Sequence, residues 1–181
     1  MNILFEKIDF LIKELNAKTE KKIARILFNN SMTISVAESC TGGLISSRLT
    51  DIAGSSSYIK NNFVTYSNDA KINLLGVNPQ TLEEHGAVSE ECALEMAEGL
   101  YNKLNKDKSS SCDITLSITG IAGPGGATAD KNVGLVYVAV KNKYSKKVKK
   151  FQINPKHCRK TMKLIFSQKA LDFLFEFLQE T

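Results

Sequence analysis

The chain contains little of what metal sites and membrane spans require. Its 181 residues include four cysteines and two histidines, and no two cysteines have the C-x-x-C spacing typical of zinc sites. We therefore expect no bound metal, and free thiols in a reducing compartment. No apolar run approaches the roughly 20 residues that cross a bilayer. The first 20 residues carry charges throughout and lack the apolar core of a signal peptide, so we expect a cytoplasmic protein with no membrane partner.

The composition is that of one ordinary globular domain. With 43% hydrophobic and 24% charged residues, a chain of this length buries a core of normal size, so we expect a single domain over residues 1–181. The net charge of +5 is concentrated in residues 141–150, which include six lysines. That stretch has one aromatic residue, Tyr144, and no arginine. We interpret it as an exposed hairpin whose lysines protect an edge strand, rather than as a nucleic-acid site.

The order of periodic segments predicts a layered α/β domain. The spacing of apolar residues and the caps predict helices over residues 3–16, 20–29, 41–50, 69–75, 80–85, 89–105 and 158–179. Runs of β-branched and apolar residues predict strands over residues 33–36, 63–66, 114–118, 133–140 and 147–153. Helices and strands in this order indicate a mixed β-sheet whose last two strands are antiparallel.

Residues 37–43, Ala-Glu-Ser-Cys-Thr-Gly-Gly, form the most informative stretch. They follow a predicted strand and contain the start of a helix that we expect to begin at Thr41. The start of a helix presents unpaired N–H groups that suit a phosphate or a carboxylate. Small and polar residues also gather at 54–57, 65–71 and 120–126. Together these loops predict one site assembled from several segments.

Four motifs carry a resemblance to a known family. They are residues 37–43, Val-Thr-Tyr-Ser-Asn-Asp-Ala-Lys at 64–71, Gly-Ala-Val-Ser at 86–89, and Gly-Ile-Ala-Gly-Pro-Gly-Gly at 120–126. The chain resembles the CinA C-terminal family, the nicotinamide-nucleotide amidohydrolases. The resemblance implies a three-layer α/β/α domain in its stand-alone form. It also implies hydrolysis of the pyridine nucleotide NMN to nicotinate mononucleotide and ammonia, without a metal or cofactor.

The resemblance also implies catalytic residues. It assigns the nucleophile to Ser56, the base to Lys71 and an assisting cation to Arg159. A lysine is a poor base at its ordinary pKa, but partial burial or a nearby cation such as Arg159 lowers that pKa. Arg159 can also bind the substrate phosphate or the oxyanion. Chemistry alone does not choose among Ser55, Ser56 and Ser57, and Cys40 is a rival nucleophile because a thiol near a helix start has a lowered pKa.

The remaining candidates would bind the substrate. Glu38 accepts ribose hydroxyls or caps the following turn, and Tyr66 lines a pyridine pocket or ends a strand. Thr119 ends an apolar strand where a hydroxyl can face a ligand. Glycines at 120–126 let the backbone approach a nucleotide closely. The full set is Glu38, Ser39, Thr41, Gly42, Gly43, Tyr66, Thr119, Gly120, Gly123 and Gly125.

Two further hypotheses concern function and assembly. A nucleotide-binding regulatory domain without turnover is the alternative to an enzyme. The predicted final helix carries Phe166, Phe173, Phe175 and Phe177 on more than one face. A helix that is apolar on several sides must bury each of them, so we expect a homodimer or a higher oligomer.

Overall fold

The computed structural model describes residues 19–106 and 111–180. A helix over residues 19–29 comes first, and the predicted helix over 3–16 lies outside the described residues. The elements that follow are β1 Ile34–Glu38, α2 Leu44–Thr50, the short 3-10 helix η1 Ser55–Ser57, β2 Phe63–Val64, α3 Asn68–Leu75, α4 Pro79–Glu84, α5 Glu90–Leu104, β3 Ile114–Gly120, β4 Leu135–Lys141, β5 Lys146–Gln152 and α6 Arg159–Gln179.

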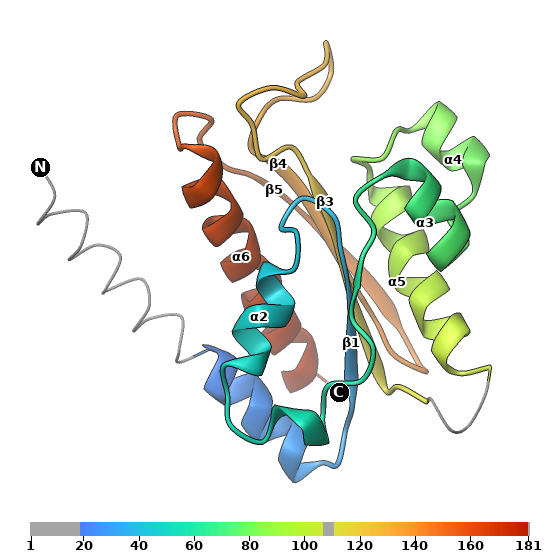
Figure 1. Cartoon of the computed structure of the whole chain (residues 1–181), viewed down its shortest axis with the longest axis vertical. Helices are drawn as coiled ribbons and strands as arrows, with labels where there is room; N and C mark the ends of the chain where they lie inside the picture. The colour runs from blue at the N-terminus through green and yellow to red at the C-terminus, as the bar shows by residue number, and fades with distance from the viewer. Residues whose placement is uncertain (1–18, 107–110, 181) are drawn as a thin grey trace, which may run out of the picture.

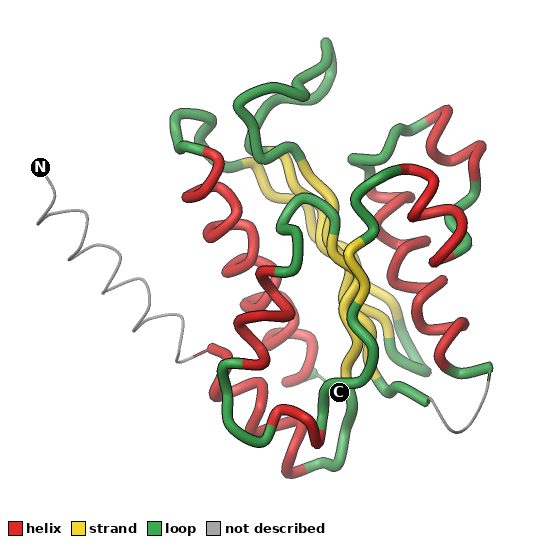
Figure 2. The backbone as a smooth tube through the Cα atoms, in the orientation of Figure 1, coloured by secondary structure: helices red, strands yellow, loops and turns green. Residues whose placement is uncertain are grey.

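The five described strands form one mixed sheet in the order β2-β1-β3-β4-β5. Strand β1 pairs in parallel with both β2 and β3, whereas β3–β4 and β4–β5 are antiparallel. The antiparallel pairing of the last two strands confirms the sequence-based prediction. Figure 1 shows the sheet edge-on between two groups of helices, and Figure 2 shows the same three layers by element type. The predicted three-layer α/β/α class is therefore confirmed.

The two faces of the sheet are covered by different helices. On one face, apolar side chains of β1 and β3 such as Val36 and Leu116 share a core with α2, α6 and the helix over 19–29. On the other face, α5 packs against β3 and β4, with α3 and α4 beside it (Figure 1). Hydrogen bonds also join β3 to α5 on this face, since the Thr115 and Ser117 hydroxyls donate to the carbonyl oxygens of Ala97 and Ala93.

Side-chain caps explain where several helices begin. The Ser67 hydroxyl accepts the Ala70 N–H at the start of α3, and the Asn78 side chain accepts the Gln80 N–H at the start of α4. Ser89 accepts the Cys92 N–H and begins α5, as its sequence context predicts. Helix α2, in contrast, begins at Leu44 with Gly43 as its N-cap, so the predicted start at Thr41 is wrong.

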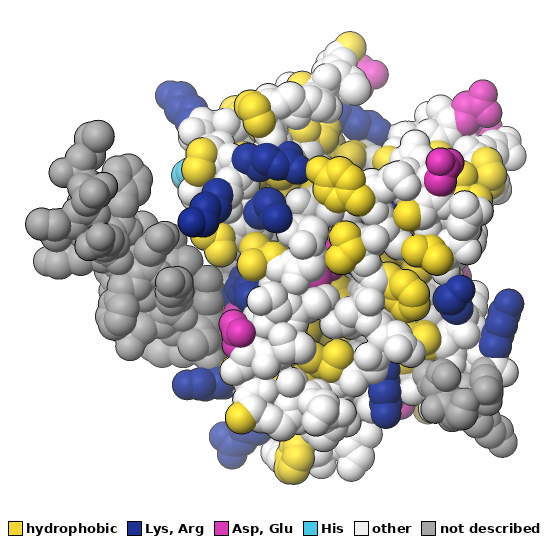
Figure 3. Space-filling view, in the orientation of Figure 1, with side chains coloured by type: hydrophobic (Ala, Val, Ile, Leu, Met, Phe, Trp, Pro, Cys, Tyr) yellow, Lys and Arg dark blue, Asp and Glu magenta, His cyan; other side chains and the backbone are white. Residues whose placement is uncertain are grey.

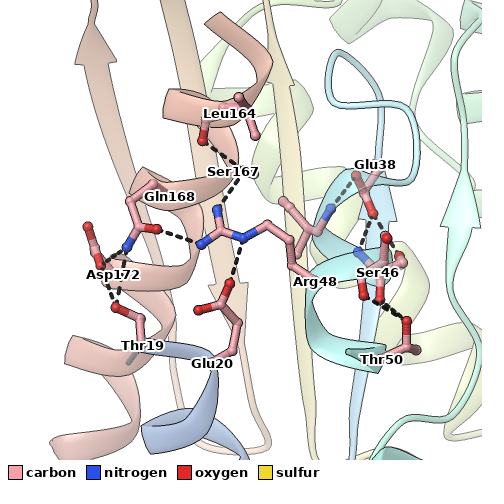
Figure 4. Close-up of polar contacts among 12 residues, drawn as sticks. Thr19, Glu20, Glu38, Ser46, Arg48, Thr50, Leu164, Ser167, Gln168 and Asp172 are labelled. Carbon is pink, nitrogen blue, oxygen red and sulfur yellow. Dashed lines mark hydrogen bonds and ion pairs between the residues drawn. The ribbon is translucent and has the colours of Figure 1, made fainter. Parts of the chain in front are cut away.

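A buried polar cluster holds the helices of one face together. Arg48 of α2 donates to Glu20 Oε1 at 2.6 Å, to Ser167 Oγ at 2.7 Å and to Gln168 Oε1 at 2.5 Å. Gln168 in turn donates to Asp172 on the next turn of α6. Figure 4 shows the Arg48 side chain reaching between α6 and the helix that carries Glu20. One guanidinium therefore ties three helices together.

Strand β5 and helix α6 bear on two predictions, the lysine-protected edge strand and self-association. Strand β5 lies at the edge of the sheet, and its Lys146, Lys147 and Lys149 pair with glutamates of α5, of α6 and of the C-cap of α6. The lysines thus belong to an edge strand, as we interpreted them. The phenylalanines of α6 pack into the core within the chain, because the sheet lies on one side of the helix and α2 on another. Self-association stays a prediction, and α6 no longer argues for it.

Candidate active site

A cleft of about 330 Å³ opens at the carboxyl ends of the three parallel strands. Helices α2 and α3 follow β1 and β2 on opposite faces of the sheet, so the chain leaves this edge in two directions. Such an edge is where open α/β sheets bind ligands. The lining residues are Ser39, Cys40, Tyr66, Lys71, Ala87, Val88, Thr119, Gly120, Ile121, Ala122, Gly125, Gly126 and Arg159.

Lys71 is the central group of this cleft. It lies on α3, and only 1% of its surface is exposed. Its Nζ lies 3.2 Å from Ser39 Oγ, 2.9 Å from the Thr65 carbonyl oxygen and 3.4 Å from the Tyr66 carbonyl oxygen. Strand β2 is shorter than predicted and ends at Val64, which leaves both carbonyls free to accept from the lysine.

Burial governs the protonation of Lys71. Desolvation lowers the pKa of this amine below its ordinary value, because a charged group loses hydration in the interior. No described carboxylate forms an ion pair with Lys71. Arg159 is not among the causes of the shift, so burial does what the sequence hypothesis assigned in part to that cation. The Lys71 amine donates to the Thr65 and Tyr66 carbonyl oxygens and to the Ser39 hydroxyl.

The structure separates Ser56 from this lysine. Ser56 is exposed in η1, and the adjoining Tyr58 carbonyl accepts from the Ile34 N–H at the start of β1. Ser39 follows the other end of the same strand. Five residues of strand span about 16 Å, so Ser56 lies near the opposite edge of the sheet. Contrary to the prediction, Ser56 lines no part of the cleft, and the hydroxyl beside Lys71 belongs to Ser39.

Cys40 lines the cleft, but its thiol is strongly disfavoured as a thiolate. The residue is buried, and desolvation raises its pKa to about 12. This shift is opposite to the one expected for a thiol at a helix start. Helix α2 begins four residues later, at Leu44, and its first N–H groups are directed at another acceptor.

That acceptor is Glu38, which is fully buried. Its carboxylate accepts from the N–H groups of Gly43, Ile45 and Ser46 at 2.8–3.1 Å and from the Ser46 hydroxyl at 2.7 Å (Figure 4). The carboxylate therefore caps α2, as one of the two sequence interpretations had it, and does not reach into the cleft. The start of α2 is occupied by this internal anion rather than left open for a ligand.

The glycine-rich loop and Arg159 form the opposite wall. Arg159, the first residue of α6, donates to the Gly123 carbonyl oxygen and to the Tyr66 hydroxyl, each at 2.7 Å. Tyr66, Gly120, Gly125 and Arg159 line the cleft, and their roles in binding and catalysis stay predictions. Gly123 contributes its carbonyl to holding Arg159 in place but does not line the cleft.

The remaining predicted residues have other neighbours. Thr119 lines the cleft, but its hydroxyl donates to the Ala87 carbonyl oxygen at 2.6 Å, so it positions the loop before α5. Thr41, Gly42 and Gly43 lie in the turn between β1 and α2 and do not line the cleft. Gly42 and Gly43 have φ values of 62° and 91°, which favour glycine.

Sequence reasoning missed several lining residues. Ala87, Val88, Ile121, Ala122 and Gly126 form apolar or backbone surface of the cleft. All lie in the two motifs at 86–89 and 120–126, so the motifs indicated this region of the site but gave these residues no role. Within residues 19–106 and 111–180, no three His, Cys, Asp or Glu side chains are grouped to hold a metal ion. No helix in the same ranges is long and apolar enough to cross a membrane.

The described residues form an α/β domain with a cleft at the carboxyl ends of its three parallel strands. The model of the CinA C-terminal domain matches residues 16–178, so the chain belongs to the CinA family. It is 43% identical over 171 residues to a putative competence-damage inducible protein of Halothermothrix orenii, which covers 94% of this chain and 40% of that protein. It is 51% identical over 130 residues to a protein of the same description from Acetivibrio thermocellus, of which it covers 30%. The chain thus spans less than half the length of these relatives.

Solved structures resemble the chain over nearly their whole length. The competence/damage inducible protein CihA from Agrobacterium tumefaciens has a TM-score of 0.83 and 38% identity, covering 91% of this chain and 95% of that one. A CinA superfamily protein from Klebsiella pneumoniae 700603 has a TM-score of 0.83 and 28% identity, covering 92% and 99%. These likenesses concern the domain described here and support the same three-layer arrangement.

Proposed function

We propose that this domain is an amidohydrolase that converts NMN to nicotinate mononucleotide and ammonia. The observation that carries the proposal is the buried amine of Lys71 beside the hydroxyl of Ser39. A serine needs a base to become a nucleophile, and a lysine serves as that base once burial has lowered its pKa. The choice of NMN as substrate comes from the family resemblance. The hydroxyl and the buried amine in the cleft support the proposal that an amide is hydrolysed there.

In the first half of the reaction, Ser39 Oγ attacks the carboxamide carbon while neutral Lys71 takes the hydroxyl proton. The tetrahedral intermediate that forms carries a negative charge on its oxygen. Lys71 then gives its proton to the amide nitrogen, the C–N bond breaks, and ammonia leaves. The product of this half is an ester between Ser39 and the nicotinoyl group.

In the second half, water replaces ammonia as the reacting group. Lys71, neutral again, takes a proton from the water as its oxygen attacks the ester carbon. The bond to Ser39 Oγ breaks, and Lys71 returns the proton to that oxygen. The sum is one NMN and one water converted to one nicotinate mononucleotide and one ammonia, with both side chains restored.

Two other parts of the cleft support this chemistry. Arg159 keeps a fixed positive charge at the cleft, where it favours a phosphate or a developing oxyanion. Its hydrogen bonds to Gly123 and Tyr66 hold it in one orientation. The exposed ring of Tyr66 offers a flat apolar surface for the pyridine ring.

The test is ammonia release from NMN by the purified protein, over a panel of pyridine nucleotides with and without EDTA. We expect turnover of NMN that EDTA does not reduce. Loss of turnover on chelation, restored by zinc or manganese, would contradict the Ser/Lys mechanism. Thermal stabilisation by NMN without ammonia release would contradict the enzyme proposal and support the regulatory alternative, a nucleotide-binding domain without turnover.

A further inference from the structure

A second basic side chain lies beside the cleft. Lys163 of α6 is half-buried, and its Nζ would lie 3.4 Å from a Cβ placed on Gly42. The Gly42 N–H donates to the Ser39 carbonyl oxygen at 3.1 Å. The amino group of Lys163 therefore rests against the same tight turn that carries the proposed nucleophile.

Lys163 and Arg159 act from one face of α6. They are four residues apart, so their side chains point in the same direction, about 6 Å apart along the helix axis. Arg159 lines the cleft, whereas Lys163 lies outside its lining, against Gly42 in the β1–α2 turn. Figure 3 shows Lys and Arg side chains gathered over this end of α6.

These two cations differ from the lysines elsewhere on the surface. On β5, Lys146, Lys147 and Lys149 each pair with a glutamate. Among the described residues, no carboxylate forms an ion pair with Arg159 or Lys163. The nearby start of α2 cannot attract an anionic ligand either, because the Glu38 carboxylate already occupies it. The unneutralised charge at this cleft is therefore positive and lies on the α6 side.

We propose that Lys163, together with Arg159, binds the phosphate of the substrate and so makes the cleft select nucleoside monophosphates over nucleosides. The proposal rests on the proposed function and adds a specificity-determining residue to it. A lysine interacts with phosphate as a compact charge, without the fork of an arginine. The paired cations would hold the phosphate while the carboxamide lies at Ser39.

The kinetic test compares NMN with nicotinamide riboside, which lacks the phosphate. For the wild-type chain, we expect a higher kcat/KM for NMN. Lys163→Gln should lower kcat/KM for NMN by about 10- to 100-fold, the effect of losing one hydrogen bond to a charged group. The same variant should leave kcat/KM for nicotinamide riboside unchanged, and Lys163→Arg should restore the preference for NMN.

The matched control is Lys160→Gln, which removes the same charge from an exposed position three residues earlier. It should change neither substrate's kcat/KM appreciably. If Lys163→Gln lowers both substrates equally, or if Lys160→Gln has the same effect as Lys163→Gln, the proposal is overturned.

A binding measurement separates this proposal from the enzymatic one. Titration calorimetry with NMN and nicotinamide riboside is carried out on Ser39→Ala, with and without Lys163→Gln. Weaker binding of NMN alone in the double variant supports the phosphate role even if the wild-type chain releases no ammonia. Equal NMN affinity in the two proteins rules the phosphate role out, whether or not the wild-type chain is an enzyme.

Discussion

The side-chain nitrogen of Lys71 lies 3.2 Å from the hydroxyl oxygen of Ser39, although the two residues are 32 positions apart in the sequence. Ser39 follows β1, and Lys71 is the fourth residue of α3. The carbonyl oxygens of Thr65 and Tyr66 fix the lysine from the other side. The lysine amine and the serine hydroxyl are thus held together where water has little access.

The first prediction concerns the choice of nucleophile. Ser39→Ala should lower kcat for NMN by on the order of 10⁴-fold or more, because the group that forms the covalent intermediate is lost. Ser56→Ala, at an exposed position near the opposite sheet edge, should keep wild-type kcat. Ammonia release by both variants is the measurement. An inactive, folded Ser56→Ala beside an active Ser39→Ala would reverse the assignment.

The second prediction concerns Cys40. Because burial raises the pKa of this thiol to about 12, it should react slowly with iodoacetamide at neutral pH. Cys40→Ala should retain substantial turnover of NMN. The exposed Cys158, whose pKa is lowered by a hydrogen bond from Thr161, serves as the internal standard in mass-spectrometric labelling. Faster alkylation of Cys40 than of Cys158 would be inconsistent with the buried thiol.

The third prediction is a pH–rate profile. The neutral form of Lys71 acts as the base, so kcat should rise with pH through its pKa in the bound complex and then level off. Burial lowers that pKa, so the rise should lie at a lower pH than for an exposed lysine. Steady-state kinetics over a range of buffers measures it. A rate that falls with rising pH over the same range would exclude a neutral lysine base.

The fourth prediction is the effect of the same group on stability. Between the lowered pKa of Lys71 in the folded chain and its ordinary pKa in the unfolded chain, only the unfolded chain holds the proton. The free energy of unfolding should therefore rise with pH in this window, by at most about 1.4 kcal/mol per pH unit. Urea denaturation of the wild type and of Lys71→Met measures it, and the difference between them should shift in favour of the wild type as pH rises. If the difference in unfolding free energy between the two proteins does not change with pH, the lowered pKa of Lys71 is contradicted.

The fifth prediction concerns the buried Arg48. Arg48→Met should destabilise the fold by about 3–5 kcal/mol, because the Glu20 carboxylate stays buried without its partner. Arg25→Met, at an exposed position on the same helix as Glu20, is the matched control and should change stability by less than about 0.5 kcal/mol. Adding Glu20→Gln to Arg48→Met should recover part of the loss. If denaturation curves give Arg48→Met and Arg25→Met the same free energy of unfolding, the stabilising role of the buried Arg48–Glu20 pair is contradicted.

Much of the site could be located from the sequence, but its chemistry could not be assigned. The motifs at 37–43, 64–71 and 120–126 do meet at one cleft, because loops after parallel strands share an edge of the sheet. Within the first motif, however, only Ser39 and Cys40 line that cleft. Glu38 is one residue away, yet its carboxylate accepts from the first N–H groups of α2. The motif therefore indicated a region, and the contacts of each side chain in the folded chain decided which residues line the cleft.

The sequence by itself determined the order of elements and the class of the fold. Local apolar periodicity and caps such as Ser89 act within a few residues, so they predict where α5 begins without knowledge of the rest. Only the tertiary structure decided which serine lies beside Lys71. After α2 the chain runs back to the sheet edge where β1 begins, which places Ser56 of η1 there, whereas Ser39 follows the other end of β1. The tertiary structure also decided the protonation of Lys71, because desolvation depends on how α3 and the strand ends pack together. Those are properties of distant segments in contact, which no local pattern of residues contains.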